Sequence, residues 1–596
     1  MNPPSTPFAG RRGVVAVLAF GFAAKLAIVL LGANRGLDIG DDGVFLLALN
    51  DPLRSPPLFE FYKLLAHFDP PLRFGLVEIR LLRVVAELGA TLALARAVFV
   101  WARSRFAAVA ELGFGPFALV VLLGALLGVG ARGFGYNDMT NVATYLAVAC
   151  LFRALDDPPE SARARSWLGL AGFALGFQLF VKFPAAVALL LAALVVVEMS
   201  PRIGLGARLA IASSIAAGVA AAVALFVLSN GGIAPLVAKW QDARELNRLA
   251  GYGVRQILAV YWRNDWASHV NGLRLWASAA AVLAIGLWLL RGRRDRLDRA
   301  LTAALAAGAL VLAWGAWTFH AVNVHPTLIA LFCLLVLLVP VAGVLALRGW
   351  RPAAARPAER RSEVFAPLLL HAALPFAAIA GTNVALTLKL PAHAAPLFVL
   401  LAIATAQLER DGLRRFAALA IGLLAVATSA VFVEHQVLRP YGLPSPLYEQ
   451  VYETPVMPGL RVDAPTKKLV EELAARLAES GFRRGDPIVA FDFMPGLVWA
   501  VGGRSPGLPF YDTDKPEQNC WAIARADLRD PPFLLFGLDM SVEQHACIHA
   551  FAFPQDYRLV AALQNPYEAP IRYFFGGQPM AFVRLFAPRR PPDPDR

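Results

Sequence analysis

Two adjacent acids, Asp41 and Asp42, follow the first long apolar run of the sequence, at residues 13–32. Carboxylates are costly near a bilayer, so acids placed there usually have a chemical role. One of the pair could act as a general base that takes a proton from an attacking hydroxyl group, while the other orients it. The competing interpretation is that these acids cap a loop helix, because Asp is a favoured N-cap residue. We favour Asp41 as the base.

Further polar residues could complete a site. Asp138 stands before an apolar run and could be a third catalytic acid or an ordinary helix cap. Lys182 lies at a break between two apolar runs, where it could contact a phosphate or simply extend from a helix end. Arg54 and Lys63 lie in the same loop as the acid pair, so we assign both to a phosphate as well. His325 and Asn383 are predicted to line the same cavity.

The composition predicts an integral membrane protein. The chain of 596 residues is 58% hydrophobic and 17% charged, whereas soluble domains carry about 25% charged residues. Its apolar runs approach the roughly 20 residues that a helix needs to cross a bilayer. The net charge of +13 comes from basic clusters between those runs, which fits the positive-inside rule if every cluster is cytoplasmic. The charge therefore reflects topology, and we expect no nucleic-acid partner.

This rule gives a membrane map with roughly thirteen spans, so the N-terminus is cytoplasmic and the C-terminus lies outside. The predicted helices cover residues 13–32, 81–102, 115–132, 140–154, 166–181, 184–199, 208–229, 272–290, 300–318, 327–347, 365–384, 395–409 and 416–433. The predicted outer loops are 33–80, 133–139, 182–183, 230–271, 319–326, 385–394 and everything after 433. The acids, Asp138 and Lys182 then share one face of the membrane.

The sequence divides into a membrane domain, 1–433, and an exported tail, 434–596. The tail is rich in Pro and charge and is predicted to form a small α/β domain, with a helix at 465–480 and strands at 487–493, 532–536 and 581–586. Cys520 and Cys547 both lie in it, and an oxidising compartment would permit a bridge. Spacing alone does not show whether they meet. No Cys/His cluster has the spacing of zinc ligands.

The first outer loop, 33–80, carries the clearest chemistry. After the acid pair it continues through Pro56 and Pro57 into residues 58–68, whose apolar side chains would share one face of a short helix. A helix of this kind lies flat in the membrane interface with its apolar face down. The loop therefore indicates a ledge that could hold a lipid-linked substrate beside two carboxylates.

These features resemble the GT-C fold glycosyltransferases, in particular the aminoarabinose lipid A transferase and protein O-mannosyltransferase group. The resemblance rests on the acid pair after the first helix, the Pro-Pro with its aromatic stretch, residues 136–139 (Tyr-Asn-Asp-Met), and the segment 169–184 with Lys182 at a helix break. It extends over the whole membrane region. The chain departs from the family pattern at Asp42, where Glu is common, and at Phe183, which replaces a small residue.

The resemblance implies transfer of a hexosyl or pentosyl group from a polyprenyl-phosphate donor to a lipid, glycan or protein acceptor of the cell envelope. It places the enzyme in the bacterial inner membrane, with the tail periplasmic and the reaction at the outer face, with inversion. No cofactor is implied; a divalent cation is possible but not indicated. The alternative is a secondary transporter or lipid flippase, although those often show a two-fold repeat that we do not find here.

Overall fold

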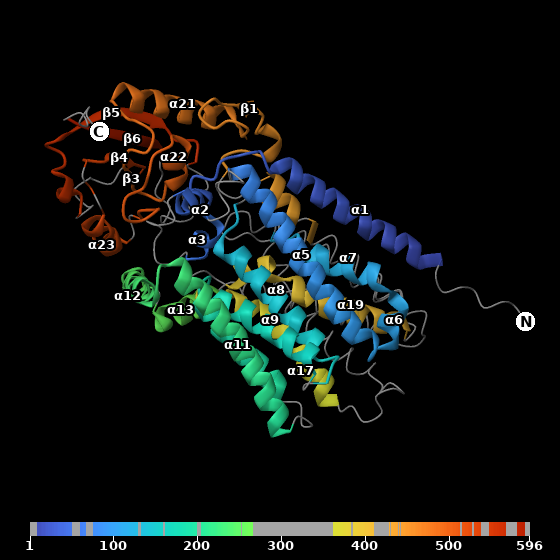
Figure 1. Ribbon diagram of the computed structural model, residues 1–596. Coiled ribbons are helices and arrows are strands. Elements are labelled where there is room, and N and C mark those ends of the chain that lie inside the picture. The colour runs from blue at the N-terminus through green and yellow to red at the C-terminus, as the bar shows by residue number, and fades with distance from the viewer. Residues whose placement is uncertain are drawn as a thin grey trace, which may run out of the picture.

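The computed structural model of the protein describes residues 9–50, 60–66, 75–128, 133–158, 161–198, 204–251, 253–265, 361–382, 386–410, 428–429, 431–438, 440, 443–512, 515–526, 528, 530–537, 547–567 and 581–589. Helices make up the first part of the chain, and a mixed α/β region follows them (Figure 1). The α-helical class with an α/β tail, predicted from sequence, is confirmed.

The apolar runs form helices of different lengths. These are α1 (Ala9–Gly32), α5 (Leu76–Arg103), α6 (Ala107–Leu112), α7 (Phe114–Ala125), α8 (Tyr136–Ala154), α9 (Ala162–Leu179), α10 (Phe183–Glu198), α11 (Leu205–Ser229), α17 (Arg361–Ile379) and α19 (Ala395–Arg410). Of the predicted spans, 272–290, 300–318, 327–347 and most of 416–433 lie outside the described residues. Each of the others coincides with a helix.

Among the described residues, three helices are long and apolar enough to cross a membrane: Val15–Gly32, Leu76–Arg103 and Leu205–Ser229. Four more apolar helices, at Phe114–Ala125, Phe183–Val195, Val364–Ile379 and Ala395–Gln407, are shorter. The number of thirteen spans therefore stays a prediction.

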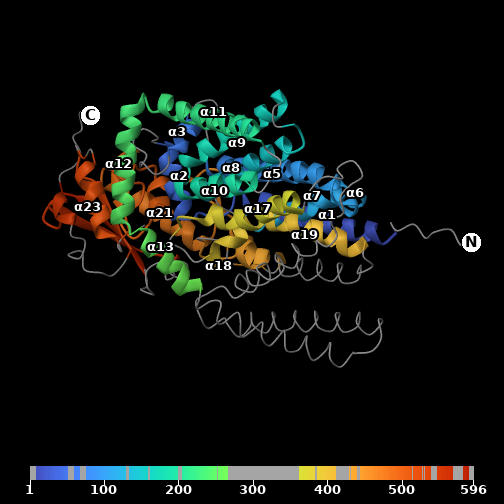
Figure 2. The same ribbon diagram turned by 90° about the horizontal axis from the view of Figure 1, so that it is seen from below.

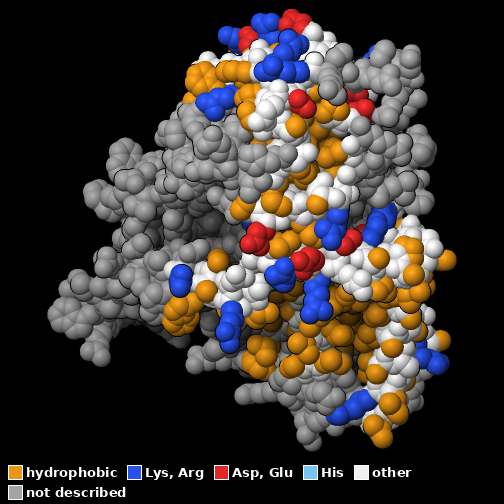
Figure 3. Space-filling model, turned by 90° about the vertical axis from the view of Figure 1, so that its left-hand side faces the viewer, with side chains coloured by type: hydrophobic (Ala, Val, Ile, Leu, Met, Phe, Trp, Pro, Cys, Tyr) orange, Lys and Arg blue, Asp and Glu red, His pale blue; other side chains and the backbone are white. Residues whose placement is uncertain are grey.

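Small residues allow the helices to approach closely. A Cβ on Gly218 of α11 would clash with the carbonyl oxygen of Gly169 in α9, and one on Gly172 would clash with the backbone at Ile215. Such small-residue contacts bring membrane helices together without a hydrophobic driving force. The outer face of α11 stays apolar, with Leu228 78% exposed. Hydrophobic side chains also prevail on the lower part of the surface in Figure 3, below a band of charged ones.

The tail contains a four-stranded sheet of order β3-β4-β6-β5, with β3 and β4 parallel and the other pairs antiparallel. Its strands are β3 (Ile488–Ala490), β4 (Phe533–Phe536), β5 (Tyr557–Gln564) and β6 (Phe582–Pro588); a separate ribbon joins β1 (Tyr452–Glu453) to β2 (Arg461–Val462). The helices are α21 (Ala464–Glu479), α22 (Pro495–Ala500) and α23 (Pro516–Arg525). Three strands and α21 match the predicted elements. Cys520 and Cys547 form a disulfide.

The segment between α1 and α2, part of the predicted first outer loop, is held between the helices and the tail. Gly36 N donates to Arg461 O at 2.7 Å, and the Tyr567 hydroxyl donates to Leu37 O at 2.6 Å. The short helix α2 (Asp41–Asn50) packs on α22 so closely that a Cβ on Gly43 would clash with the backbone of Gly496. The acid pair therefore stands where the two parts of the chain meet, with α2 beside the tail in Figure 1.

Two more helices complete this junction. α3 (Phe61–Ala66) packs against α2, and α12 (Ile233–Leu249) reaches from the end of α11 to α23 (Figure 2). Leu246 of α12 is buried in the tail's own hydrophobic core. Many of the predicted outer loops thus gather at one end of the helices, together with the tail. The boundary between the two domains at residue 433 remains a prediction.

Candidate active site

The candidate site forms around the first turn of α8, where side chains from several loops converge. Asp42 lies on one side of it, fully buried, and its Oδ2 accepts a hydrogen bond from Arg80 Nη2 at 2.8 Å. Its Oδ1 accepts from the backbone N–H of Gly133, just before α8. Both oxygens of this carboxylate are therefore held by donors from the protein.

Arg80 organises the loop around Asp42. This side chain from the first turns of α5 is 1% exposed and also donates to the carbonyl oxygens of Ala33, Arg35 and Gly36, at 2.9–3.2 Å. A buried guanidinium with so many acceptors fixes the path of the chain between α1 and α2, because unpaired buried charge is costly. The Asp42–Arg80 pair thus positions α2.

Asp41 occupies a different environment. It is only partly buried, in the first turn of α2, where its charge lies near the positive end of the helix. Its charge acts on the hydroxyl of Tyr62 in α3, which donates to Phe134 O at 2.8 Å. Burial raises the pKa of Tyr62 well above its usual value, and the charges of Asp138, Asp42 and Asp41 add to this effect. All three predicted acids therefore act on a single buried tyrosine.

Asp138 has the capping role considered from sequence, and it also forms an ion pair; a catalytic role for it stays a prediction. Its Oδ2 accepts from the backbone N–H of Gly135 at 2.8 Å, which caps α8, and its Oδ1 lies 3.0 Å from Arg83 Nη2. Arg83 also approaches Glu87, at 4.0 Å, and Glu87 Oε1 accepts from Asn141 Nδ2 at 3.2 Å. Asp138 is thus the outermost member of a buried network that runs along α5.

Lys182 lies on the other side of the first turn of α8. Its Nζ donates to Ala378 O at 2.7 Å and to Asn137 Oδ1 at 3.4 Å, and stands 6.0 Å from the centre of the Tyr136 ring. Burial lowers the pKa of Lys182 to about 7, and the positive charge of Lys389 contributes. The predicted acids and this lysine are therefore brought together by α8.

Two further basic residues that sequence reasoning did not select lie here. Lys389 ends α18 (Leu386–Lys389), and His393 ends the following turn of 3₁₀-helix, η3 (Leu390–His393). His393 is buried and its Nδ1 is hydrogen-bonded to Asn141 Oδ1. Burial lowers the pKa of His393 well below its usual value, and Lys182 and Lys389 add to the effect. The sequence signal that could have identified them is their position in the predicted outer loop 385–394, on both sides of Pro391.

Lys63 lies at the same end of the helices as the candidate site, but its partners are other residues. Its Nζ lies 3.3 Å from Glu60 Oε2 and donates to Asn230 Oδ1, while Lys239 of α12 lies 3.7 Å from Glu60 Oε1. This cluster links the first loop to α12. The other predicted residues, Arg54, His325 and Asn383, lie outside the described residues.

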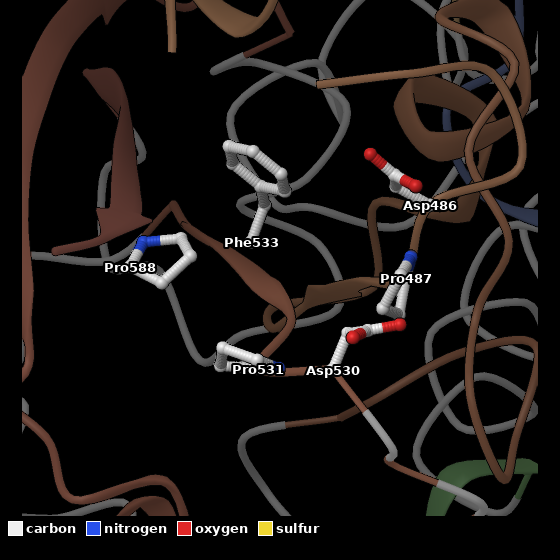
Figure 4. Close-up of a pocket in the computed structure, with 6 residues that line it drawn as sticks. All are labelled: Asp486, Pro487, Asp530, Pro531, Phe533 and Pro588. Atoms are coloured by element: carbon white, nitrogen blue, oxygen red, sulfur yellow. The ribbon is translucent and has the colours of Figure 1, made fainter. Parts of the chain in front are cut away.

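A small surface hollow lies in the tail rather than at the acids. It is lined by Asp486, Pro487, Asp530, Pro531, Phe533 and Pro588 (Figure 4). These residues mark the start of β3, the start of β4 and the end of β6, which is one edge of the sheet. The segment that packs on α2, which includes α22, follows the opposite end of β3. The hollow is therefore separate from the candidate site. Within the described ranges, no three His, Cys, Asp or Glu side chains group as a metal site would require.

Fold and site together define an α-helical protein of membrane type, whose acids and lysines meet beneath an α/β tail. Among solved structures, the chain is similar to ArnT from Cupriavidus metallidurans bound to undecaprenyl phosphate, with 13% identity over 96% of this chain and 98% of that one, and a TM-score of 0.40. The chain is also similar to ArnT from the same organism in the apo state, with 14% identity over 97% of this chain and 98% of that one, and a TM-score of 0.41. No protein-family model and no curated protein sequence matches the chain.

Proposed function

We propose that the protein is a membrane glycosyltransferase. It would move a hexosyl or pentosyl group from a polyprenyl-phosphate donor to a lipid, glycan or protein acceptor of the cell envelope, at the outer face of the bacterial inner membrane. The observation that carries this proposal joins two facts about the first turn of α8. The partly exposed carboxylate of Asp41 lies near Tyr62, whose pKa is also raised by Asp138 of that turn, and Lys182 contacts Asn137 of the same turn. A transfer from a phosphate carrier needs both groups.

Asp41 is assigned as the base because Asp42 already gives both of its oxygens to Arg80 and Gly133. In the inverting reaction, the acceptor oxygen attacks the anomeric carbon while the bond from that carbon to the phosphate oxygen breaks. The acceptor proton passes to Asp41, and the polyprenyl phosphate leaves with the electron pair. Asp138 stays paired with Arg83 and keeps the first turn of α8 in place.

Lys182 and Lys389 are assigned to the leaving phosphate. Burial disfavours the charged form of Lys182 and lowers its pKa to about 7, so a nearby anion would stabilise the protonated form. A phosphate bound nearby would favour the protonated form and would be stabilised in turn. Lys63 is a weaker candidate, since Glu60 and Asn230 already engage it.

The test is sugar transfer by the full-length protein in lipid nanodiscs, with a panel of radiolabelled polyprenyl-phosphate sugars and an extract of envelope lipids and glycans. We expect one donor to be consumed by the wild type, and the turnover of Asp41→Asn to fall by about 10²–10⁴-fold. Glu479→Gln, on the exposed face of α21, is the control and should keep full activity. If no donor is consumed, while vesicles containing the protein take up a labelled lipid or solute, the alternative of a transporter or flippase replaces this proposal.

A further inference from the structure

The loop after β3 holds two consecutive residues in a conformation that side chains rarely adopt. Asp492 and Phe493 have φ angles of 64° and 59°, in the left-handed region that favours glycine. Such strained residues persist only where the surroundings fix them, and they cluster at functional sites. Here the Asp492 carboxylate accepts from Gly537 N at 2.7 Å, and Phe493 N donates to Tyr511 O at 3.0 Å.

This turn directs the ring of Phe493 onto the first outer loop. A Cβ on Gly40, the residue before Asp41, would lie 3.0 Å from Cε1 of Phe493, so the ring lies directly against that glycine. Three residues further along the tail, Gly496 N donates to Ile39 O at 2.7 Å. The tail therefore contacts the backbone immediately before the proposed base.

A second ring from the tail joins the first. Phe510 packs edge-to-face on Phe493 with their centres 5.3 Å apart, and both rings are only partly buried. Both pack against the hydrophobic cluster that contains Phe45 and Tyr62. Phe493 and Phe510 thus extend the aromatic cluster of Phe45 and Tyr62, and part of the surface of each ring remains accessible.

We propose that Phe493 and Phe510 bind a sugar ring of the acceptor beside Asp41. This inference rests on the proposed function and adds that the tail determines the acceptor. The donor lipid enters from the membrane, whereas these rings come from the part of the chain outside the helices. Partly exposed aromatic rings offer flat apolar faces that match the C–H faces of a pyranose, and such rings beside a few polar groups are typical of ligand sites.

The test uses two soluble probes as inhibitors of the transfer reaction, below the concentration at which either forms micelles. Octyl glucopyranoside carries a sugar ring on an octyl chain, and 1-octanol carries the chain alone. We expect the glucoside to compete with the acceptor, and its inhibition constant to rise about tenfold in Phe493→Leu and in Phe510→Leu. Phe493→Tyr keeps the flat ring and should restore the wild-type value.

A matched control comes from the same domain. Phe482 and Phe533 form a similar pair, 5.5 Å apart. Phe533 begins β4 beside the start of β3, whereas Phe493 follows the end of β3, so Phe482→Leu should leave inhibition by the glucoside unchanged. The KM for the donor should also stay constant in the two test variants, which a general structural defect would not allow.

Three outcomes would overturn this inference. These are an unchanged inhibition constant in both variants, an equal change for 1-octanol, which would mean that the rings bind an acyl chain, and a rise in donor KM alone. Each of them requires a wild-type protein that consumes a polyprenyl-phosphate sugar. A wild-type protein that consumes none refutes the proposed function itself, so the two failures are distinct.

Discussion

The different environments of the two adjacent acids predict that the same substitution affects stability at one position and activity at the other. Asp42→Asn removes the charge that faces Arg80, and both side chains are at most 1% exposed. Breaking a buried ion pair leaves an uncompensated charge and costs about 3–5 kcal/mol. Asp41→Asn removes a partly exposed charge near the start of a helix, an effect worth about 0.3–1 kcal/mol. Asp42→Asn should therefore lower stability strongly, and Asp41→Asn should lower activity.

The assay measures, for the wild type and each variant in the same detergent, the Tm of thermal unfolding and the turnover per folded molecule. Arg476–Glu479 provides the control, because its N–O distance of 2.8 Å equals that of Arg80–Asp42, although its side chains are 52% and 60% exposed. Surface pairs contribute about 0–1 kcal/mol, so Glu479→Gln should scarcely change the Tm.

Two results would refute this reasoning. Equal Tm shifts for Asp42→Asn and Glu479→Gln would show that the buried pair does not position α2. Turnover of Asp41→Asn at the wild-type rate would show that Asp41 is not the base, even if the stability ranking holds.

The remaining predictions concern one lysine and the contacts that hold the first loop. Lys182 is protonated below its pKa of about 7, so kcat/KM for the donor should fall by about tenfold per pH unit above that value, whereas Lys182→Arg, which stays charged, should give a flat profile over this range. Gly43→Ala should lower the Tm, because overpacking against the backbone of α22 costs about 1–3 kcal/mol; Gly89→Ala, in an open part of α5, should raise it slightly. Tyr567→Phe should cost about 1 kcal/mol through the lost hydrogen bond to Leu37 O, and an unchanged Tm would show that this bond does not contribute.

The positions of the helices and of three tail strands follow from local patterns. Apolar runs and turn residues are visible in any window of the sequence, so these elements could be predicted. β5 was not predicted, although residues 559–563 are all apolar. It is an edge strand in which Tyr557 and Leu563 alone are buried, so its apolar run does not mark a buried strand. The pairing of Cys520 with Cys547 also needed the fold, since it depends on two segments meeting.

The candidate site was only partly predictable for the same reason. Types and order of residues indicated Asp41, Asp138 and Lys182, but the partners of the acids are far away in sequence or inside predicted spans. Arg80, Arg83 and Glu87 recur at three- and four-residue spacing, which places them on one face of α5. Ionisable residues at such positions in an apolar helix are a functional signal in themselves. The complete burial of Asp42, by contrast, depends on Arg80 of α5 and on the backbone at Gly133, which only the folded chain brings together.

The hydrogen bond between Tyr567 and Leu37 joins residues 530 positions apart. At about 5–20 residues per second, a ribosome needs on the order of 30–100 s to make the intervening chain. For most of that time α2 has been synthesised, while the strained turn at Phe493, α22 and Tyr567 have not. The acid pair thus reaches its final setting only when synthesis is nearly complete, which means that a truncated chain stalled in the membrane would carry the carboxylates without the surface that orders them.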